Sequence, residues 1–317
     1  MRIVMLEPIG ISDKELNSYK KELESKGHDF IFYDNRVEKD DILIERIGEA
    51  EIIILTNLPL SARVLNSCSD LKLISVAFTG VDHIDKEACQ KNGITVCNSS
   101  GYADEAVAEL VFGLSISLMR NVIPCDQVVR KGKTRAGLIG NELAGKKLGI
   151  IGTGSIGSRV AEIGSVLGCE LFGNDLEEKE ELQELGLTYL ELDELMSSCD
   201  IISLHVPLLE STKGMIDQEK INLMKKDAIL INTARGPVVD SEALAAALQK
   251  GVIAGAGIDV FEMEPPIPED HPLLNAPHTV VTPHVAFATE EAFSKRADIV
   301  FDNVFSWLEG KTKNKMF

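Results

Sequence analysis

Short apolar runs alternate with amphipathic stretches in the first hundred residues, and this alternation predicts parallel α/β structure. Strands are expected at Ile3–Leu6, Asp29–Tyr33, Ile52–Leu55, Leu73–Val76 and Ile94–Val96. Helical patterns lie between them, for example over Lys14–Lys26 and Asp41–Ala50. Strands that alternate with helices favour parallel sheets with helices packed on both faces.

A second series of apolar runs follows a break in the pattern. Strands are expected at Lys147–Ile151, Cys169–Asn174, Ile201–Leu204, Ala228–Asn232, Ile253–Ile258 and Thr279–Val281. Together the two series are too many for one ordinary open sheet. The length of 317 residues also favours two domains. We therefore predict an α/β protein with two doubly wound parallel-sheet domains.

Three segments connect or follow the two series. Asp104–Arg120 is expected to form one long helix, apolar on nearly all sides and therefore buried. The basic, glycine-containing stretch Arg130–Gly140 leads from it toward the second sheet. A final helix over Glu290–Leu308 follows the second series, so we expect it to return to the first domain.

The composition limits the classes of partner. There are 32 Lys and Arg against 50 Asp and Glu, a formal net charge of −18, which repels nucleic acid and anionic lipid. An anionic substrate would need local positive charge at its site. The six cysteines have no CxxC spacing and no neighbouring His cluster, so no metal is expected. No signal peptide or apolar run of about 20 residues is found, and a cytoplasmic protein without membrane contact is predicted.

A glycine motif lies between the strand Lys147–Ile151 and the helical pattern Ser158–Leu167. It reads Gly152-Thr-Gly154-Ser-Ile-Gly157. In the GxGxxG pattern the first glycine permits a tight turn, the second lets a pyrophosphate approach the backbone, and the third lets helix and strand pack closely. The setting of strand, turn and helix predicts a dinucleotide site.

Two further features of the motif favour NAD. The amides of Ser155 and Ile156 at the start of the helix would face the phosphates. Asp175 ends the next strand, at roughly the 20-residue spacing of such sites, where its carboxylate binds ribose hydroxyls and repels a 2′-phosphate. The alternative is a glycine-rich turn without ligand, with Asp175 as a surface carboxylate. The combination of strand, helix and Asp favours the NAD site.

Three polar residues follow apolar runs of the second series. Arg235 lies in Asn-Thr-Ala-Arg-Gly-Pro, Glu264 in Asp-Val-Phe-Glu-Met-Glu-Pro-Pro, and His284 in Thr-Pro-His-Val-Ala-Phe. In open α/β sheets, ligands bind beyond the carboxyl ends of the strands. We therefore expect these side chains near the dinucleotide.

These residue types suit the reduction of a keto acid. A bidentate Arg binds a carboxylate and polarises a ketone. A His donates the proton, and a carboxylate orients that His and favours its protonated form. Taken singly, each residue is more often structural: a surface ion pair, a solvated Glu or a hydrogen-bonded core His. Only their joint placement favours the catalytic interpretation of Arg235, Glu264 and His284.

Several motifs in order resemble the D-isomer-specific 2-hydroxyacid dehydrogenase family over essentially the whole chain. They are Ala77–Asp85, Ala106–Glu109, Leu143–Gly157, His205-Val-Pro207, Asn232–Gly236, Gly257–Phe261 and Thr282-Pro-His284. The resemblance implies a Rossmann NAD-binding domain over 99–287, inserted into a flavodoxin-like substrate domain formed by 1–98 and 288–317. It also implies a homodimer.

The resemblance implies roles for individual residues. Arg235 would bind and polarise the substrate, His284 would act as acid and base, and Glu264 would be its partner. The backbone amides of Thr79, Gly80 and Val81 would bind the substrate carboxylate. Further implied cofactor contacts are His205, Val206 and Pro207 near the adenosine half, Asp259 at the nicotinamide carboxamide, and Thr212, Thr233 and Ala234.

Departures from the family pattern narrow the substrate. Phosphoglycerate dehydrogenases of this family carry Arg after the third strand to hold a phosphate. The stretch Thr56–Leu60 has no cation, which disfavours a phosphorylated substrate unless a basic residue from elsewhere substitutes. Glu264, where formate dehydrogenases have Gln, argues against that branch. Arg135 stands where many relatives have Trp. Leu58, Phe78 and Phe287 are interpreted either as pocket walls or as core.

The resulting hypothesis is an NAD-dependent dehydrogenase acting on an unphosphorylated acid such as glyoxylate, hydroxypyruvate, pyruvate or a branched 2-keto acid. Two alternatives stay open. One is D-3-phosphoglycerate dehydrogenase of serine synthesis, and the other is an NAD(H)-sensing regulatory protein on the same scaffold.

Overall fold

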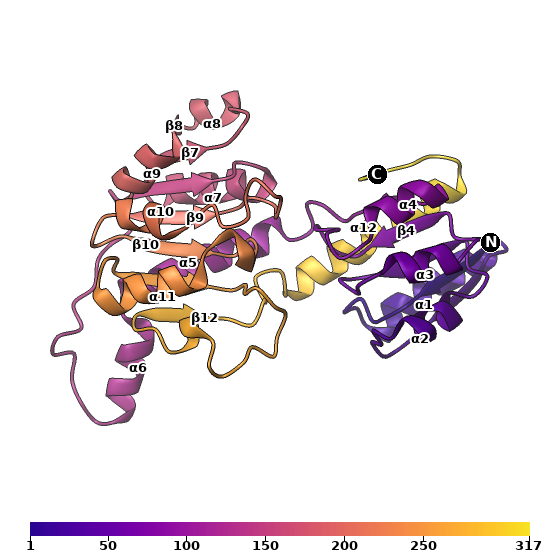
Figure 1. Cartoon of the computed structure of the whole chain (residues 1–317), viewed down its shortest axis with the longest axis horizontal. Helices are drawn as coiled ribbons and strands as arrows, with labels where there is room; N and C mark the ends of the chain where they lie inside the picture. Colours follow the sequence, from indigo (N-terminus) through magenta and orange to yellow (C-terminus); the bar gives the residue numbers. More distant parts are fainter. The chain divides into compact units, whose positions relative to one another are not determined.

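The computed structural model describes residues 1–317, which form two compact units (Figure 1). The first unit comprises Met1–Ala103 and Ala288–Phe317, and the second comprises Asp104–Phe287. The sequence-based boundary at 98/99 lies five residues earlier than the observed one at 103/104. Residues 99–103 stay with the first unit because Ser99 donates from its amide to the Phe78 carbonyl and from its hydroxyl to the Val76 carbonyl.

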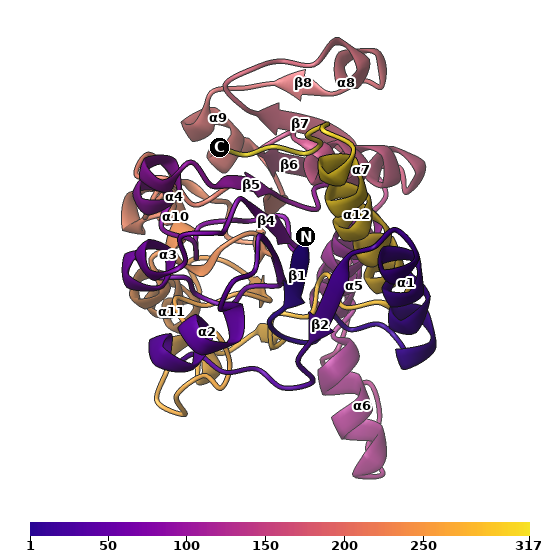
Figure 2. The same ribbon diagram turned by 90° about the vertical axis from the view of Figure 1, so that its right-hand side faces the viewer.

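The first unit contains a five-stranded parallel sheet of order β2-β1-β3-β4-β5. Its strands are β1 (Arg2–Met5), β2 (Asp29–Phe32), β3 (Ile52–Leu55), β4 (Leu73–Val76) and β5 (Thr95–Cys97). Helices α1 (Asp13–Ser25) and α12 (Glu290–Leu308) cover one face, and α2 (Asp40–Ile47), α3 (Ala62–Ser67) and α4 (Lys86–Asn92) cover the other (Figure 2). All five predicted strands are present, with ends that differ by one residue at most.

Helix α12 returns to the first unit, as predicted, and completes its core. Its apolar positions Ala297, Val300, Phe301 and Val304 recur at helical spacing and are fully buried. Each buried Val or Phe contributes about 1.5–3 kcal/mol relative to exposure. Ser75 on β4 donates its hydroxyl to the Val300 carbonyl at 3.0 Å, which ties the helix to the sheet.

The end of the chain also pairs with this sheet. The amide of Met316 donates to the Val96 carbonyl at 2.8 Å, and the Val96 amide donates to the Phe317 carbonyl at 3.0 Å. These bonds cover the outer edge of β5, which would otherwise expose unpaired backbone groups.

The second unit contains a seven-stranded parallel sheet of order β12-β11-β10-β9-β6-β7-β8. Its strands are β6 (Lys147–Ile151), β7 (Glu170–Asn174), β8 (Thr188–Tyr189), β9 (Ile201–Leu204), β10 (Ile229–Asn232), β11 (Gly255–Ile258) and β12 (Thr279–Val281). All six predicted strands are present, and the predicted fold class is confirmed. The sequence pattern missed β8, because two residues are too few to show a periodicity.

Helices cover both faces of the second sheet. The helices are α5 (Asp104–Met119), α6 (Val122–Arg130), α7 (Ser155–Val166), α8 (Glu180–Glu184), α9 (Leu192–Ser198), α10 (Gln218–Leu223), α11 (Ser241–Lys250) and the 3₁₀ turns η1 (Gly236–Val238) and η2 (Pro272–Leu274). Helix α5 packs on α7 and on β10, β11 and β12, which explains its apolar composition. Helix α6 was not predicted, and it buries none of its side chains.

No single helix is long and apolar enough to cross a membrane, although α5 and α6 together, across their 57° bend, pass such a test by length and composition.

The packing of β6 gives a test of the second unit's core. A Cβ atom added to Gly149 would lie 2.6 Å from Leu195 Cδ2 and 2.9 Å from Cys199 Sγ, and both side chains are fully buried. We predict that Gly149→Ala destabilises the unit by about 1–3 kcal/mol, because the core has no room for a methyl group.

Thermal unfolding monitored by circular dichroism measures this effect. The control is Gly113→Ala on α5, where the added Cβ meets only Leu110 Cδ1 at 3.9 Å. This variant should be as stable as wild type or up to about 1 kcal/mol more stable, because Ala has a higher helix propensity than Gly. An unchanged melting temperature for Gly149→Ala would contradict the packing argument.

Candidate active site

The glycine turn after β6 has the conformation that its sequence predicts. Gly152 has φ +91°, and a Cβ there would lie 2.7 Å from the His205 backbone. A Cβ on Gly157 would lie 2.0 Å from the Gly152 carbonyl oxygen. Beside Gly154, by contrast, a Cβ would meet nothing within 4 Å. The first and third glycines are therefore required by packing, and the second leaves open space where a phosphate can approach.

Helix α7 begins at Ser155, three residues before the predicted start at Ser158. Gly and Ser at the turn gave no helical signal. Ser155 and Ile156 consequently lie in the first turn of α7, and no side chain caps that end. Uncapped amides at a helix N-terminus, next to open space, are suited to an anion.

Asp175 lies directly after β7, and its carboxylate is fixed to the glycine turn. Oδ2 accepts from the Thr153 amide at 2.6 Å and from the Thr153 hydroxyl at 3.1 Å. Oδ1 accepts from the Leu176 amide at 2.7 Å. The Tyr189 hydroxyl on β8 lies 3.0 Å from Thr153 Oγ1. Thr153 and Tyr189 thus orient Asp175, a support that sequence analysis missed because β8 gave no signal.

The loop after β9 lies beside the glycine turn, as the close approach of Gly152 to His205 requires. Desolvation lowers the pKa of His205 to about 3. The ring is therefore neutral near pH 7. Its Nε2 lies 2.8 Å from the Ser203 hydroxyl, with which it forms a hydrogen bond. Thr212 holds the loop's turn, since its hydroxyl donates to the Pro207 carbonyl at 2.6 Å and accepts from the Leu209 amide at 2.8 Å.

The loop after β10 contains an unsatisfied polar atom. Thr233 is buried, and its hydroxyl oxygen has no hydrogen-bond partner in the protein. Native proteins rarely leave such groups unpaired. With the open space at Gly154 and the fixed carboxylate of Asp175, this hydroxyl fits a bound dinucleotide.

Arg235, Glu264 and His284 follow three neighbouring strands. Asn232 on β10 pairs with Ile258 on β11, which in turn pairs with Val281 on β12, so the strands end at one level. His284 Nδ1 lies 2.8 Å from Glu264 Oε2 and 3.0 Å from Oε1. The His284 side chain is only 13% exposed, whereas that of Glu264 is 60% exposed. The structure thus forms the predicted His–carboxylate pair.

Asp259 fixes the backbone around His284. His284 has φ +56°, in the left-handed region that few residues other than glycine adopt. The fully buried carboxylate of Asp259 accepts from the Thr282 hydroxyl at 2.5 Å and from the Val285 and Ala286 amides at 2.9 Å each. Bonds on both sides of His284 therefore stabilise its unusual conformation. The sequence alone predicts only a nicotinamide contact for Asp259.

The turn that carries Arg235 is held by Asn232. The Asn232 side chain accepts from the Ala234 amide and donates to the Arg235 carbonyl, at 3.0 Å each. Arg235 Nη1 donates to the Ala234 carbonyl at 2.8 Å. A Cβ on Gly236 would lie only 1.9 Å from the Phe261 carbonyl carbon, so only Gly fits at this position. The guanidinium is therefore presented from a rigid turn.

The first unit carries the remaining predicted residues. Thr79, Gly80 and Val81 form a half-buried turn after β4, and the Thr79 carbonyl accepts from the Asn98 side chain at 2.8 Å. Leu58 and Phe78 are buried in this unit and belong to its core. In the second unit, the Phe287 ring packs edge-on against His284, with centroids 5.4 Å apart.

A cation does reach the loop after β3, from outside that loop. Arg36 donates to Asn57 Oδ1 at 2.8 Å, to Glu7 Oε2 at 2.7 Å and to Glu38 Oε1 at 2.9 Å. Glu7 is almost fully buried. Two carboxylates therefore neutralise the charge of Arg36.

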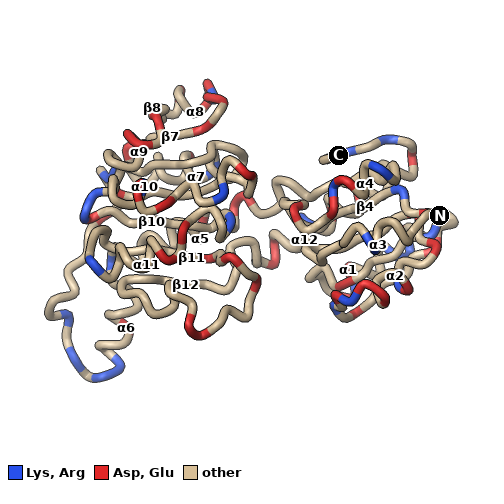
Figure 3. Tube along the Cα trace, in the orientation of Figure 1, with Lys and Arg blue, Asp and Glu red and all other residues tan.

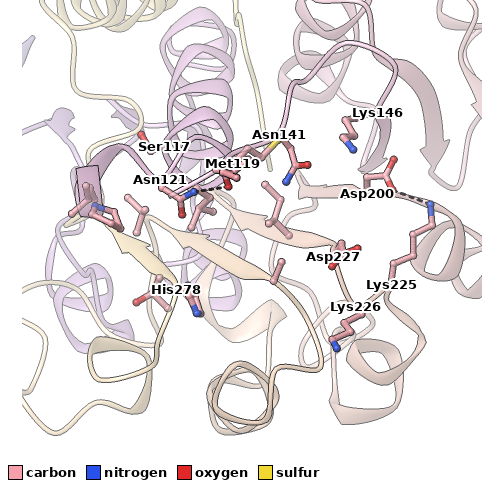
Figure 4. Close-up of a pocket in the computed structure, with 18 of the residues that line it drawn as sticks. Ser117, Met119, Asn121, Asn141, Lys146, Asp200, Lys225, Lys226, Asp227 and His278 are labelled. Carbon is pink, nitrogen blue, oxygen red and sulfur yellow. Dashed lines mark hydrogen bonds and ion pairs between the residues drawn. The ribbon is translucent and has the colours of Figure 1, made fainter. Parts of the chain in front are cut away.

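A pocket of about 810 Å³ lies at the opposite, amino ends of the strands of the second unit (Figure 4). It is lined by the end of α5, by α6 and by residues such as Lys146, Lys225 and His278. None of the predicted site residues lines it. The candidate site is therefore at the other edge of the sheet.

Comparisons with known proteins place the chain in a family. The family profile described as "D-isomer specific 2-hydroxyacid dehydrogenase, NAD binding domain" matches residues 112–286. The chain is 40% identical over 297 residues to glycerate dehydrogenase of Methylorubrum extorquens, covering 90% of this chain and 91% of that protein. It is 38% identical over 277 residues to glyoxylate reductase of Korarchaeum cryptofilum, covering 85% and 83% respectively.

A similar solved structure is that of an acyclic imino acid reductase in complex with NADPH and D-Arg. The TM-score is 0.90 at 29% identity, and the match covers 100% of both chains. The matched family profile spans more than half of this chain, over the unit that carries the glycine turn and the His–Glu pair. The protein therefore belongs to the D-isomer-specific 2-hydroxyacid dehydrogenase family, as an NAD-dependent oxidoreductase.

Proposed function

We propose that this enzyme reduces a small unphosphorylated 2-keto acid, such as glyoxylate, hydroxypyruvate or pyruvate, to the D-2-hydroxy acid in the cytoplasm. The observation that carries the proposal is the contact of His284 Nδ1 with Glu264. These two residues follow β12 and β11, and Arg235 follows the neighbouring strand β10. Relatives named glycerate dehydrogenase and glyoxylate reductase support the substrate class.

Three residues of the second unit have separate roles in the reaction. When bound, NADH supplies the hydride. The Arg235 guanidinium binds the substrate carboxylate and polarises its ketone. Because Nδ1 of His284 faces Glu264, its Nε2 gives the proton to the forming alkoxide and takes it back in the reverse reaction. Glu264 holds the ring orientation and stabilises the imidazolium.

Other residues hold the two reactants. The amides of Ser155 and Ile156 bind the pyrophosphate, and Asp175 binds the adenosine ribose. The orphaned Thr233 hydroxyl, Ala234 and Asp259 contribute to the nicotinamide half. The amides of Thr79, Gly80 and Val81 bind the substrate carboxylate.

The preference for an unphosphorylated acid rests on charge. The loop Thr56–Leu60 has no cation of its own. Arg36, which does reach it, is bound by Glu7 and Glu38. A phosphate there would have to compete with two carboxylates for a single guanidinium, which is unfavourable.

The enzyme acts as a homodimer through α6 and the loop that follows it. Val129 is 71% exposed and Ile139 is 81% exposed, and such apolar surface favours association. Lys131, Lys133 and Arg135 are exposed near the end of α6, where Figure 3 shows Lys and Arg gathered. The chain as a whole carries a net charge of −18, so this basic segment is complementary to a second copy.

NADH oxidation against a panel of keto acids tests the reaction. We expect turnover with at least one unphosphorylated acid and little with phosphohydroxypyruvate. His284→Asn should lower kcat about 100-fold or more while NADH binding, followed by fluorescence, is retained. Asn tolerates the left-handed backbone at this position.

His278→Asn is the matched control, since His278 also has φ +56° but lies at the amino end of β12. It should retain wild-type kcat. NADH binding without turnover on any acid would favour an NAD(H)-sensing protein. Strong turnover of phosphohydroxypyruvate alone would favour phosphoglycerate dehydrogenase.

The fixed carboxylate of Asp175 predicts the choice of cofactor. Wild type should prefer NADH over NADPH by at least about tenfold in kcat/KM, because the carboxylate repels a 2′-phosphate. Asp175→Ser should reduce this preference, measured with both cofactors at a saturating substrate concentration. Glu177→Gln, which removes a charge from an exposed position of the same loop, should not. Equal use of both cofactors by wild type would argue against this role.

Multi-angle light scattering tests the dimer. We expect a mass of twice 34.6 kDa, and a shift toward monomer in the double variant Lys131→Glu/Lys133→Glu, because the reversal removes the charge complementarity. Reversal of Lys14 and Lys21, which are exposed on α1, is the control. A monomeric wild type at micromolar concentration would rule the proposal out.

A further inference from the structure

The loop that carries Glu264 has little regular structure of its own. It runs from the end of β11 at Ile258 to η2 at Pro272. Glu264 must nevertheless stay within 2.8–3.0 Å of His284 Nδ1. Catalytic groups generally need positions fixed to about 0.5 Å, so another interaction has to hold this loop.

Glu262 and His271 close the loop on either side of Glu264. His271 Nε2 lies 3.0 Å from Glu262 Oε2. The His271 ring is buried, and its Nδ1 accepts from the Leu273 amide at 3.3 Å. Since Nδ1 accepts a hydrogen bond, Nε2 carries the ring proton and donates a hydrogen bond to Glu262. The Phe261 ring packs edge-on against His271, with centroids 5.1 Å apart.

The Glu262 carboxylate also binds Ser241, the first residue of α11. Partial burial alone would raise the pKa of Glu262, but hydrogen bonds from Ser241 and His271 outweigh this effect and lower it. The group is therefore an anion near pH 7 and a strong acceptor for both donors.

Ser241 belongs to the segment that continues from Arg235. Between them lie η1 and the N-cap Asp240. Gly236 in this segment packs directly on the backbone of Phe261, the residue before Glu262. Glu262 thus connects the turn that presents Arg235 with the loop that presents Glu264.

We propose that Ser241, Glu262 and His271 form a positioning network that holds Glu264 against His284 and in register with the Arg235 turn. These three side chains contact neither reactant and are not catalytic residues. The inference rests on the proposed function, since it assigns the network to the Glu264–His284 pair of that reaction. Closing the loop restricts the positions that Glu264 can occupy, so more molecules have the catalytic geometry.

His271→Leu tests the network, because it removes the donor to Glu262. We expect kcat to fall about 10- to 100-fold, with the dissociation constant of NADH changed less than twofold. His271→Gln, whose side-chain amide can still donate to Glu262, should recover most of kcat. Asp270→Asn, an exposed neighbour in the same loop, should behave as wild type.

Ser241→Ala provides a second variant in case His271→Leu does not fold. It removes one bond to Glu262 but leaves Asp240, the N-cap of α11, in place. A smaller fall in kcat, again without loss of NADH binding, is expected.

A measurement independent of turnover separates this inference from the proposed function. In ¹⁵N-histidine-labelled protein, the Nδ1–H proton of His284 that is bound to Glu264 should give a downfield resonance, identified by its loss in His284→Asn. We expect this resonance to broaden or disappear in His271→Leu and to persist in His271→Gln and Asp270→Asn. This result would support the network even if no keto acid were reduced.

The opposite result would overturn it. If His271→Leu and Ser241→Ala keep the resonance and the wild-type kcat, and only the melting temperature falls, the network serves stability and not the position of Glu264.

Discussion

The buried carboxylate of Asp259 is the interaction on which the catalytic edge depends. A charge without access to water is costly unless hydrogen bonds replace its hydration. Here one hydroxyl and two amides do so, and all three come from the chain around His284. The same bonds maintain the left-handed backbone of His284. Without them that residue would relax toward a more common conformation and turn its ring away from Glu264.

Local sequence patterns were sufficient for the two sheets and for the glycine turn. The strands are apolar because both faces of a parallel sheet are covered, and Gly152 and Gly157 are required by contacts within a short stretch. The supports of the site were less visible. Thr153, Tyr189, Glu262 and His271 act through partners that are distant in the chain or on elements too short to show a period. Helix α6 was also missed, since its apolar residues, such as Val122, Ile123 and Val129, are exposed and mark no buried face.

The predicted site residues differ in how far geometry supports them. The pairing of His284 with Glu264 and the fixed position of Asp175 are direct contacts, at 2.8 Å and 2.6 Å. His205 and Thr212 have hydrogen-bond partners of their own within the protein, namely the Ser203 hydroxyl for His205 and backbone groups of Pro207 and Leu209 for Thr212. Three residues assigned to the substrate, Thr79, Gly80 and Val81, belong to the first unit. Their predicted role uses backbone amides, whose direction cannot be predicted from a pattern of side chains.

The division of the first unit in the sequence affects the order of folding. Its sheet lies before the second unit, but Phe301, a large buried side chain of its core, is contributed by α12 after that unit. The strand edge at Val96 is likewise covered only by Met316 and Phe317. During synthesis, the nucleotide-binding unit is therefore complete while the first unit still lacks part of its core. The part of the first sheet's apolar face that α12 covers stays exposed until α12 has been made, and this interval is when the chain is most prone to aggregate or to need a chaperone.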